Sequence, residues 1–133
     1  MKTIVLDASA LLAMLFGQPG MEQMREMFHK ASEADKPVFM SAVNWAEVVY
    51  KLEQKHGAEG KATAQRFAHT TPLAVEPVDR ELAEAAAALK VKHDLGLADA
   101  FAAALAIAKK AELVAGDKEF AAVEKEIKIN WLK

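Results

Sequence analysis

The chain has 133 residues, of which 53% are hydrophobic and 27% charged, and its formal net charge is −2 at pH 7. This size and composition predict one folded domain over residues 1–133 with a substantial core, and the slightly acidic balance excludes broad basic attraction to nucleic acid. The absence of cysteine excludes a disulfide framework and a thiolate metal site, and no apolar run predicts a signal peptide or a membrane span, so we expect a cytoplasmic protein without membrane association.

The first predicted elements alternate between an apolar run and helical spacing. Residues 3–6 (TIVL) predict a strand that is buried on both faces and central in a parallel sheet. Ser9 is a candidate N-cap for a helix over residues 10–16. The turn cluster at residues 17–20 separates this helix from a second helix over residues 21–34.

The same alternation continues to the end of the chain. The remaining predicted strands cover residues 38–40, 73–75, 112–115 and 128–131. The remaining predicted helices cover residues 42–55, 58–69, 80–92, 98–108 and 118–123. Short strands that alternate with helices, without a hairpin signal such as Asn-Gly, predict an α/β protein: a three-layer α/β/α sandwich around a five-stranded parallel sheet.

One predicted helix is apolar on every side except for a single carboxylate. Between Ala98 and Ala108, Asp99 is the only polar residue. A helix without a polar face is normally buried on all sides. A carboxylate in its first turn is costly to bury unless it is paired, protonated or bound to a metal ion. Asp99 is therefore a candidate site residue.

Three further acids fall where they would meet Asp99. Asp7 directly follows the first strand, Asp117 follows the fourth, and Glu47 lies near the start of the helix after the second strand. Ligands bind beyond the carboxyl ends of parallel strands, so these acids gather at one edge if strands 1 and 4 are neighbours. Clustered carboxylates take up protons or bind a hard divalent cation, and oxygen-only ligands favour Mg²⁺ or Mn²⁺ over Zn²⁺. Such an ion could activate a water for attack on a phosphate.

Four segments of the sequence resemble a known family. They read VLDASALLAMLF at 5–16, SAVNWAEVVYKL at 41–52, LGLADAFAAALA at 95–106 and LVAGDKEF at 113–120. In this order and spacing they resemble the PIN domain and, more narrowly, the VapC toxins of bacterial and archaeal toxin–antitoxin pairs. The resemblance implies a PIN-like fold with strand order 3-2-1-4-5 and a Mg²⁺- or Mn²⁺-dependent endoribonuclease.

The resemblance also implies roles and partners. Asp7, Glu47, Asp99 and Asp117 match the family's acidic quartet, which holds the metal ion and carries catalysis, and Ser9 matches a hydroxyl position beside the first acid. In this interpretation a metal-held water cleaves structured RNA, such as a transfer RNA or ribosomal RNA loop, and leaves a 5′-phosphate and a 3′-hydroxyl. The family further implies a homodimer and a VapB-type antitoxin whose C-terminal segment covers the acidic cleft.

Plain structural interpretations stand beside these roles. Glu47 is also placed to pair with Lys51 on the helix surface, and Asp117 is also placed to cap the next short helix. Ser9 has the alternative of an N-cap, and Asn44, the second supporting candidate, has the alternative of a residue of the capping region.

Two other classes of function remain as alternatives. One is a PIN-like module that binds protein or RNA with weak or no catalysis; Ala115, where such proteins usually carry Thr or Ser, is the one feature that favours it. The other is a phosphoryl-transfer domain. A haloacid-dehalogenase-type phosphatase needs an acid two residues after its nucleophilic Asp, where this chain has Ser9. A receiver presents its phosphorylated Asp after the middle strand and a Lys after the last strand. The sequence meets neither pattern.

Overall fold

The computed structural model describes all 133 residues. The strands are β1 (Ile4–Leu6), β2 (Val38–Ser41), β3 (Leu73–Glu76), β4 (Glu112–Ala115) and β5 (Ile129–Trp131). The helices are α1 (Ala8–Leu15), α2 (Met21–Glu33), α3 (Ala42–His56), α4 (Ala58–Thr70), α5 (Arg80–His93), α6 (Leu97–Ala108) and the 3-10 helix η1 (Lys118–Val123). Every predicted element is present, with its ends within two residues of the prediction.

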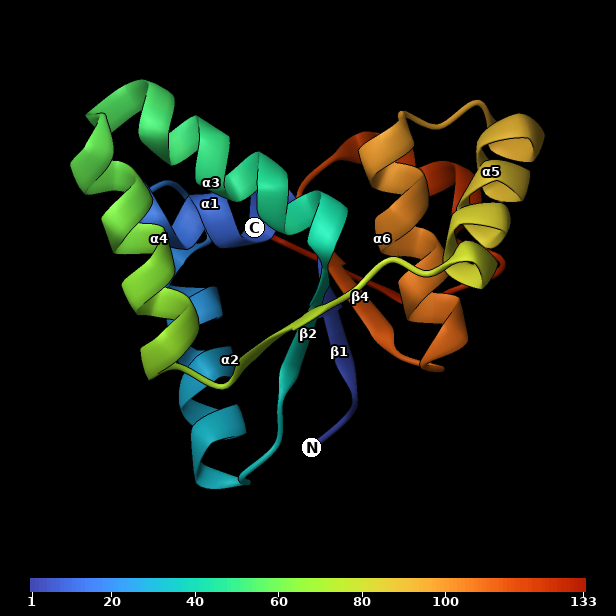
Figure 1. Ribbon diagram of the computed structural model, residues 1–133. Coiled ribbons are helices and arrows are strands. Elements are labelled where there is room, and N and C mark those ends of the chain that lie inside the picture. Colours follow the sequence, from blue (N-terminus) through green and yellow to red (C-terminus); the bar gives the residue numbers. More distant parts are fainter.

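The five strands form one parallel sheet in the order β3-β2-β1-β4-β5. Helices α1 to α4 cover one face of the sheet, and α5 and α6 cover the other face, as Figure 1 shows. Strands β1 and β4 are neighbours, with Leu6 opposite Val114. This confirms the predicted three-layer α/β/α sandwich and its strand order, and it brings the segments that follow β1 and β4 together.

The central strand β1 divides the core into two parts. The side chain of Val5 packs with α5, α6 and η1, whereas Ile4 and Leu6 pack with α1 to α4. This is the period of two expected of a strand whose faces are both covered. In α6 every residue from Ala100 to Ala106 is buried, so this helix is enclosed as its composition predicts. Asp99 is therefore carried on a rigid, buried element.

One predicted helix boundary is wrong. Helix α1 begins at Ala8, and its N-cap is Asp7, whose side chain accepts a hydrogen bond from the Ala10 amide. Ser9 therefore lies in the first turn and does not cap the helix. The physical reason is that Asp is as good an N-cap as Ser, and the strand ends one residue before Asp7, so the helix begins at the first available cap.

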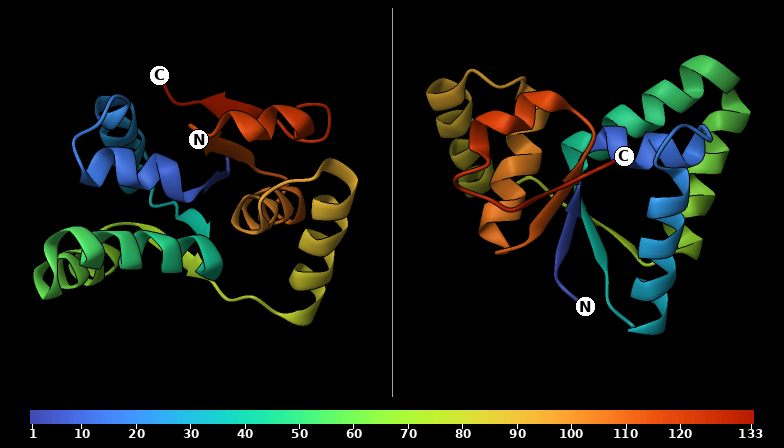
Figure 2. Two further views of the ribbon diagram at one scale, coloured as in Figure 1. Left: turned by 90° about the horizontal axis from the view of Figure 1, so that it is seen from above. Right: turned by 180° about the vertical axis from the view of Figure 1, so that it is seen from behind.

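The C-terminal segment closes the sheet against the N-terminal helices. In the right-hand view of Figure 2, β5 crosses beside β4 and its end reaches α1 and α2. The Gln23 amide donates hydrogen bonds to the Asn130 side chain at 3.3 Å and the Trp131 carbonyl at 3.4 Å. None of the helices is long and apolar enough to span a bilayer.

Candidate active site

Asp7 is the most buried of the predicted acids, with 2% of its surface exposed. It follows β1 directly, and its amide donates to the Val114 carbonyl of the neighbouring strand at 3.2 Å. Its carboxylate accepts hydrogen bonds from the Ala10 amide at 2.9 Å and from the Ser9 hydroxyl at 2.6 Å. Both oxygens are therefore held in place at the carboxyl edge of the sheet.

The Ser9 hydroxyl joins the two loops that carry Asp7 and Asp117. It donates to Asp7 and accepts a hydrogen bond from the Gly116 amide at 3.2 Å, one residue before Asp117. Ala115 is fully buried in the apolar cluster of α6 and η1. The structure thus supplies a hydroxyl link to the Asp117 loop from the β1 side, although the chain carries Ala rather than Thr or Ser at position 115.

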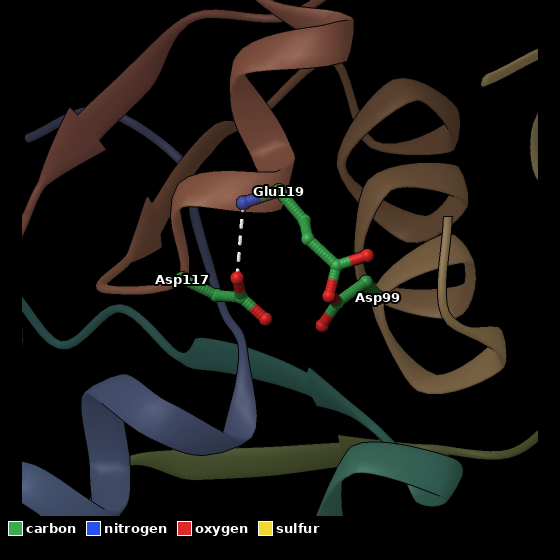
Figure 3. A group of neighbouring side chains, drawn as sticks. All are labelled: Asp99, Asp117 and Glu119. Atoms are coloured by element: carbon green, nitrogen blue, oxygen red, sulfur yellow. Dashed lines mark hydrogen bonds between the residues drawn. The ribbon is translucent and has the colours of Figure 1, made fainter. Parts of the chain in front are cut away.

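Asp99 and Asp117 meet, and a third acid joins them. Asp99 lies in the first turn of α6, and Asp117 caps η1 by accepting from the Glu119 amide at 2.9 Å. Asp99, Asp117 and Glu119 each offer an oxygen that lies within 4.8 Å of the other two. Figure 3 shows the three carboxyl groups turned toward one another between α6 and η1.

Two pKa values show how strongly these carboxyl groups affect one another. Burial raises the pKa of Asp7 to about 6, and the charges of Asp117 and Glu47 add to this rise, while the bonds from Ser9 and Ala10 oppose it. Burial also raises the pKa of Asp99 to about 8, with further contributions from its contact with Asp117 and from the charges of Asp7 and Glu119. Burial and the neighbouring carboxyl groups therefore favour the protonated form of Asp99 when no cation is bound.

Glu47 is placed at the margin of this cluster. Its carboxylate pairs with the Lys51 ammonium at 2.9 Å on the same helix, as the plain structural interpretation anticipates. Its charge nevertheless acts on Asp7. Of the four predicted acids, the group of three carboxyl groups within 4.8 Å of one another includes Asp99 and Asp117 and does not include Asp7 or Glu47.

Asn44, the second supporting candidate, is buried, with 1% of its surface exposed. Its backbone amide donates to the Ser41 hydroxyl at 3.1 Å, so Asn44 belongs to the N-terminal cap of α3. Its side chain also reaches across to α6, where it donates to the Ala98 carbonyl at 3.0 Å. The residue is therefore both part of a cap and a contact with the helix that carries Asp99.

Sequence reasoning missed Glu119. Its signal is the spacing Asp117-Lys118-Glu119 directly after a strand, which puts two acids at the start of a short helix. That spacing is ambiguous in the sequence, because acids are also favoured in the first turn of any helix by its dipole. Only the position of η1 over α6 turns Glu119 toward Asp99.

The donor set fits a hard divalent cation. All side chains in the cluster offer carboxylate oxygens, and no His or Cys takes part, which is the ligand chemistry of Mg²⁺ and Mn²⁺. Asp99, Asp117 and Glu119 are the residues spaced to hold such an ion. The raised pKa values of Asp7 and Asp99 reflect uncompensated negative charge together with burial, and a bound cation would compensate that charge.

Comparison with protein families identifies this arrangement. The model of the PIN domain matches residues 4–126. The chain belongs to the PIN domain family. Its PIN domain is related to the VapC ribonucleases: the chain is 31% identical over 99 residues to ribonuclease VapC30 of Mycobacterium tuberculosis and equally to a VapC ribonuclease of Mycobacterium bovis. In each comparison the match covers 71% of this chain and 72% of the relative.

Solved structures of PIN proteins share the fold. The DNA-bound VapBC of Salmonella typhimurium matches with a TM-score of 0.78 at 18% identity over 100% of both chains. VapC20 of Mycobacterium tuberculosis, a toxin that cleaves the sarcin–ricin loop, matches with a TM-score of 0.65 at 26% identity over 91% of this PIN domain and 95% of that chain. The observed strand order also differs from the order 2-1-3-4-5 of a receiver, and membership of the PIN family decides against the phosphoryl-transfer alternative.

Proposed function

We propose that this PIN protein is a Mg²⁺- or Mn²⁺-dependent endoribonuclease and the toxin of a VapBC-type pair. The observation that carries the proposal is the convergence of Asp99, Asp117 and Glu119 at the carboxyl edge of the sheet, beside the buried Asp7. Relationship to VapC ribonucleases at 31% identity supports the same activity. Net charge is −2, so attraction to an RNA phosphate must come from a local positive charge at this edge.

We assign the metal-holding and catalytic roles to Asp7, Asp99 and Asp117, with Glu47 at the margin of the site. A divalent cation held by these acids supplies Lewis-acid activation of a water and neutralises charge that develops on the phosphate. Asp7 offers a carboxylate that Ser9 and Ala10 already orient, so little reorganisation is needed when a ligand binds. Glu119 adds a further carboxylate on the Asp117 side.

The partners we propose are an RNA loop, a VapB-type antitoxin and a second copy of the chain. Neighbours in fold include VapBC complexes from Rickettsia felis and Salmonella typhimurium, which supports an antitoxin partner. VapC20, which is similar in fold, cleaves the sarcin–ricin loop, and single-stranded loops are where bases are accessible to proteins, so we propose a structured RNA loop as the substrate. A monomeric mass in light scattering at micromolar concentration would refute the homodimer.

The deciding experiment is induction of the protein without an antitoxin, with the wild type and Asp99→Asn compared by growth and by mapping of RNA 5′-ends. We expect growth arrest and a discrete new cleavage site only with the wild type. Arrest by both proteins without cleavage would overturn the nuclease and favour a binding module. Cleavage by Asp99→Asn at the wild-type rate would overturn the assignment of the site.

A further inference from the structure

A single hydrogen bond connects the helix of Glu47 with the helix of Asp99. The Asn44 side-chain amide on α3 donates to the Ala98 carbonyl of α6 at 3.0 Å. No other hydrogen bond joins these two helices. Ala98 directly precedes Asp99, and Asn44 lies one turn before Glu47 on the same face of α3. The bond therefore lies next to two of the proposed site residues.

The orientation of the Asn44 amide is fixed from both ends. The Ser41 hydroxyl accepts from the Asn44 backbone amide at 3.1 Å and donates to the Asn44 side-chain oxygen at 2.5 Å. The Ala98 carbonyl can only accept, so the amide nitrogen must face α6 and the amide oxygen must face Ser41. With Ser41 and Asn44 both buried, water cannot replace these partners, and the amide has one satisfied arrangement.

The other side-chain hydrogen bond near the start of α6 lies before its N-cap, where the Lys90 ammonium of α5 donates to the Leu95 carbonyl at 2.9 Å. The N-cap of α6 is Gly96, which provides no side-chain hydrogen bond. The other contacts of α6 are mostly apolar, such as the cluster against which Val43 of α3 packs. Apolar burial is non-directional and tolerates small shifts, whereas a hydrogen bond weakens steeply when its geometry changes.

We propose that Asn44 is a positioning residue that fixes the first turn of α6, and with it Asp99, and so sets the affinity of the acidic site for a divalent cation. This inference rests on the proposed function, because it requires that the acidic cluster binds a divalent cation. Asn44 does not reach the acids itself; it acts by holding Ala98, and with it the first turn of α6, against α3.

The test compares Asn44→Ala with the wild type and with Gln23→Ala as a matched control. Gln23 also forms a side-chain amide bridge, from α2 to β5, but it makes no hydrogen bond to α3 or α6. The Ser41 cap of α3 survives in Asn44→Ala, because it uses the backbone amide of residue 44. We expect Mn²⁺ binding, measured by calorimetry on the purified full chain, to weaken about tenfold in Asn44→Ala, as is typical for loss of an outer-shell partner, and to be unchanged in Gln23→Ala.

Two further measurements separate positioning from a purely structural role. In the metal-free protein, hydrogen exchange of the amides of Asp99 to Phe101 should accelerate in Asn44→Ala and stay unchanged in Gln23→Ala. RNA cleavage by Asn44→Ala should recover when Mn²⁺ is raised above the weakened dissociation constant. Unchanged Mn²⁺ affinity in folded Asn44→Ala would overturn the proposal.

A second variant keeps the proposal testable if Asn44→Ala does not fold. Ser41→Ala retains the Asn44 amide but removes the hydroxyl that both orients this amide and caps α3. We expect a smaller loss of Mn²⁺ affinity with the same change in hydrogen exchange. Wild-type Mn²⁺ affinity in Ser41→Ala would then overturn it. If the wild type itself binds no Mn²⁺, the proposed function fails, whereas hydrogen exchange in α6 still decides whether Asn44 holds the helix.

Discussion

Strand β4 has a carboxylate at each end, and the two have opposite surroundings. At its start, Glu112 lies between two cations, 3.5 Å from the Lys2 ammonium and 3.6 Å from that of Lys128. Beyond its other end, Asp117 contacts Asp99 and Glu119. The first carboxylate ties the N-terminus and β5 to β4. The second faces other carboxylates and no lysine pairs with it.

The comparison teaches how to distinguish a structural acid from a functional one in this fold. A hollow of about 580 Å³ lies beside Glu112 and is lined also by Lys110, yet the charge of Glu112 is already matched by its ion pairs with Lys2 and Lys128. At the other end of the strand, burial and like charges raise the pKa of Asp99 to about 8. The candidate site is therefore identified by unpaired carboxyl groups that lie close together, and not by the size of a hollow.

The largest expected effect is that a divalent cation stabilises the folded protein by binding near Asp117, and not near Glu112 at the other end of β4. Ligand at 100 times its dissociation constant raises the free energy of unfolding by about 2.7 kcal/mol, so Mn²⁺ should raise the melting temperature of the wild type by several degrees. Differential scanning calorimetry should show this rise in Glu112→Gln as well, and not in Asp117→Asn. An equal rise in all three proteins would mean that the ion binds elsewhere.

Without metal, substitutions of the acids near the two ends of β4 should change the free energy of unfolding in opposite directions. Asp99→Asn removes a carboxyl group from the repelling cluster, and we expect the free energy of unfolding at pH 8 to rise by about 1 kcal/mol, a figure reduced for solvent screening of a partly exposed group. Glu112→Gln removes the partner of two exposed lysines, and we expect a loss of at most about 1 kcal/mol. Urea denaturation of both variants measures the difference. Destabilisation by Asp99→Asn would show that its carboxyl group is structurally required.

The pH dependence of stability sharpens the same contrast. The folded pKa values of Asp7 and Asp99, about 6 and about 8, lie above the ordinary value of 3.8, so between about pH 4 and pH 8 the folded state binds more protons than the unfolded state. The contribution of these groups to the free energy of unfolding therefore falls as pH rises through this window. The stabilising effect of Asp99→Asn should be absent near pH 4 and largest above pH 8. A difference independent of pH would contradict the raised pKa.

Much of this arrangement could be predicted because the informative patterns are local. Residues 3–6 show a doubly buried strand, and residues 98–108 a helix without a polar face apart from Asp99. The alternation of such segments indicates a parallel sheet, and the family resemblance supplied its strand order. Acids directly after neighbouring parallel strands then had to lie at one edge, as Asp7 and Asp117 do, and Asp99 from the first turn of α6 meets Asp117 there.

The remaining details depend on tertiary contacts. Ser9 and Asp7 are both good N-caps, and only the exact end of β1 decides between them. The inclusion of Glu119 depends on where η1 lies over α6. The bridge from Asn44 to Ala98 spans 54 positions in the chain and ends on a backbone carbonyl, which no side-chain pattern in the sequence can indicate.

The smallest expected effect concerns Lys51, the cation that pairs with Glu47 at 2.9 Å. Both side chains are partly exposed, so Lys51→Ala should change the free energy of unfolding by no more than about 0.5 kcal/mol. The same substitution frees the Glu47 carboxylate and removes a positive charge near the cluster, so Mn²⁺ should bind about twofold more tightly in calorimetry. Lys55→Ala is the matched control, because Lys55 lies one turn further along α3, over the Phe16 ring. Weaker Mn²⁺ binding by Lys51→Ala would show that the lysine supports the site rather than competing with the cation for Glu47.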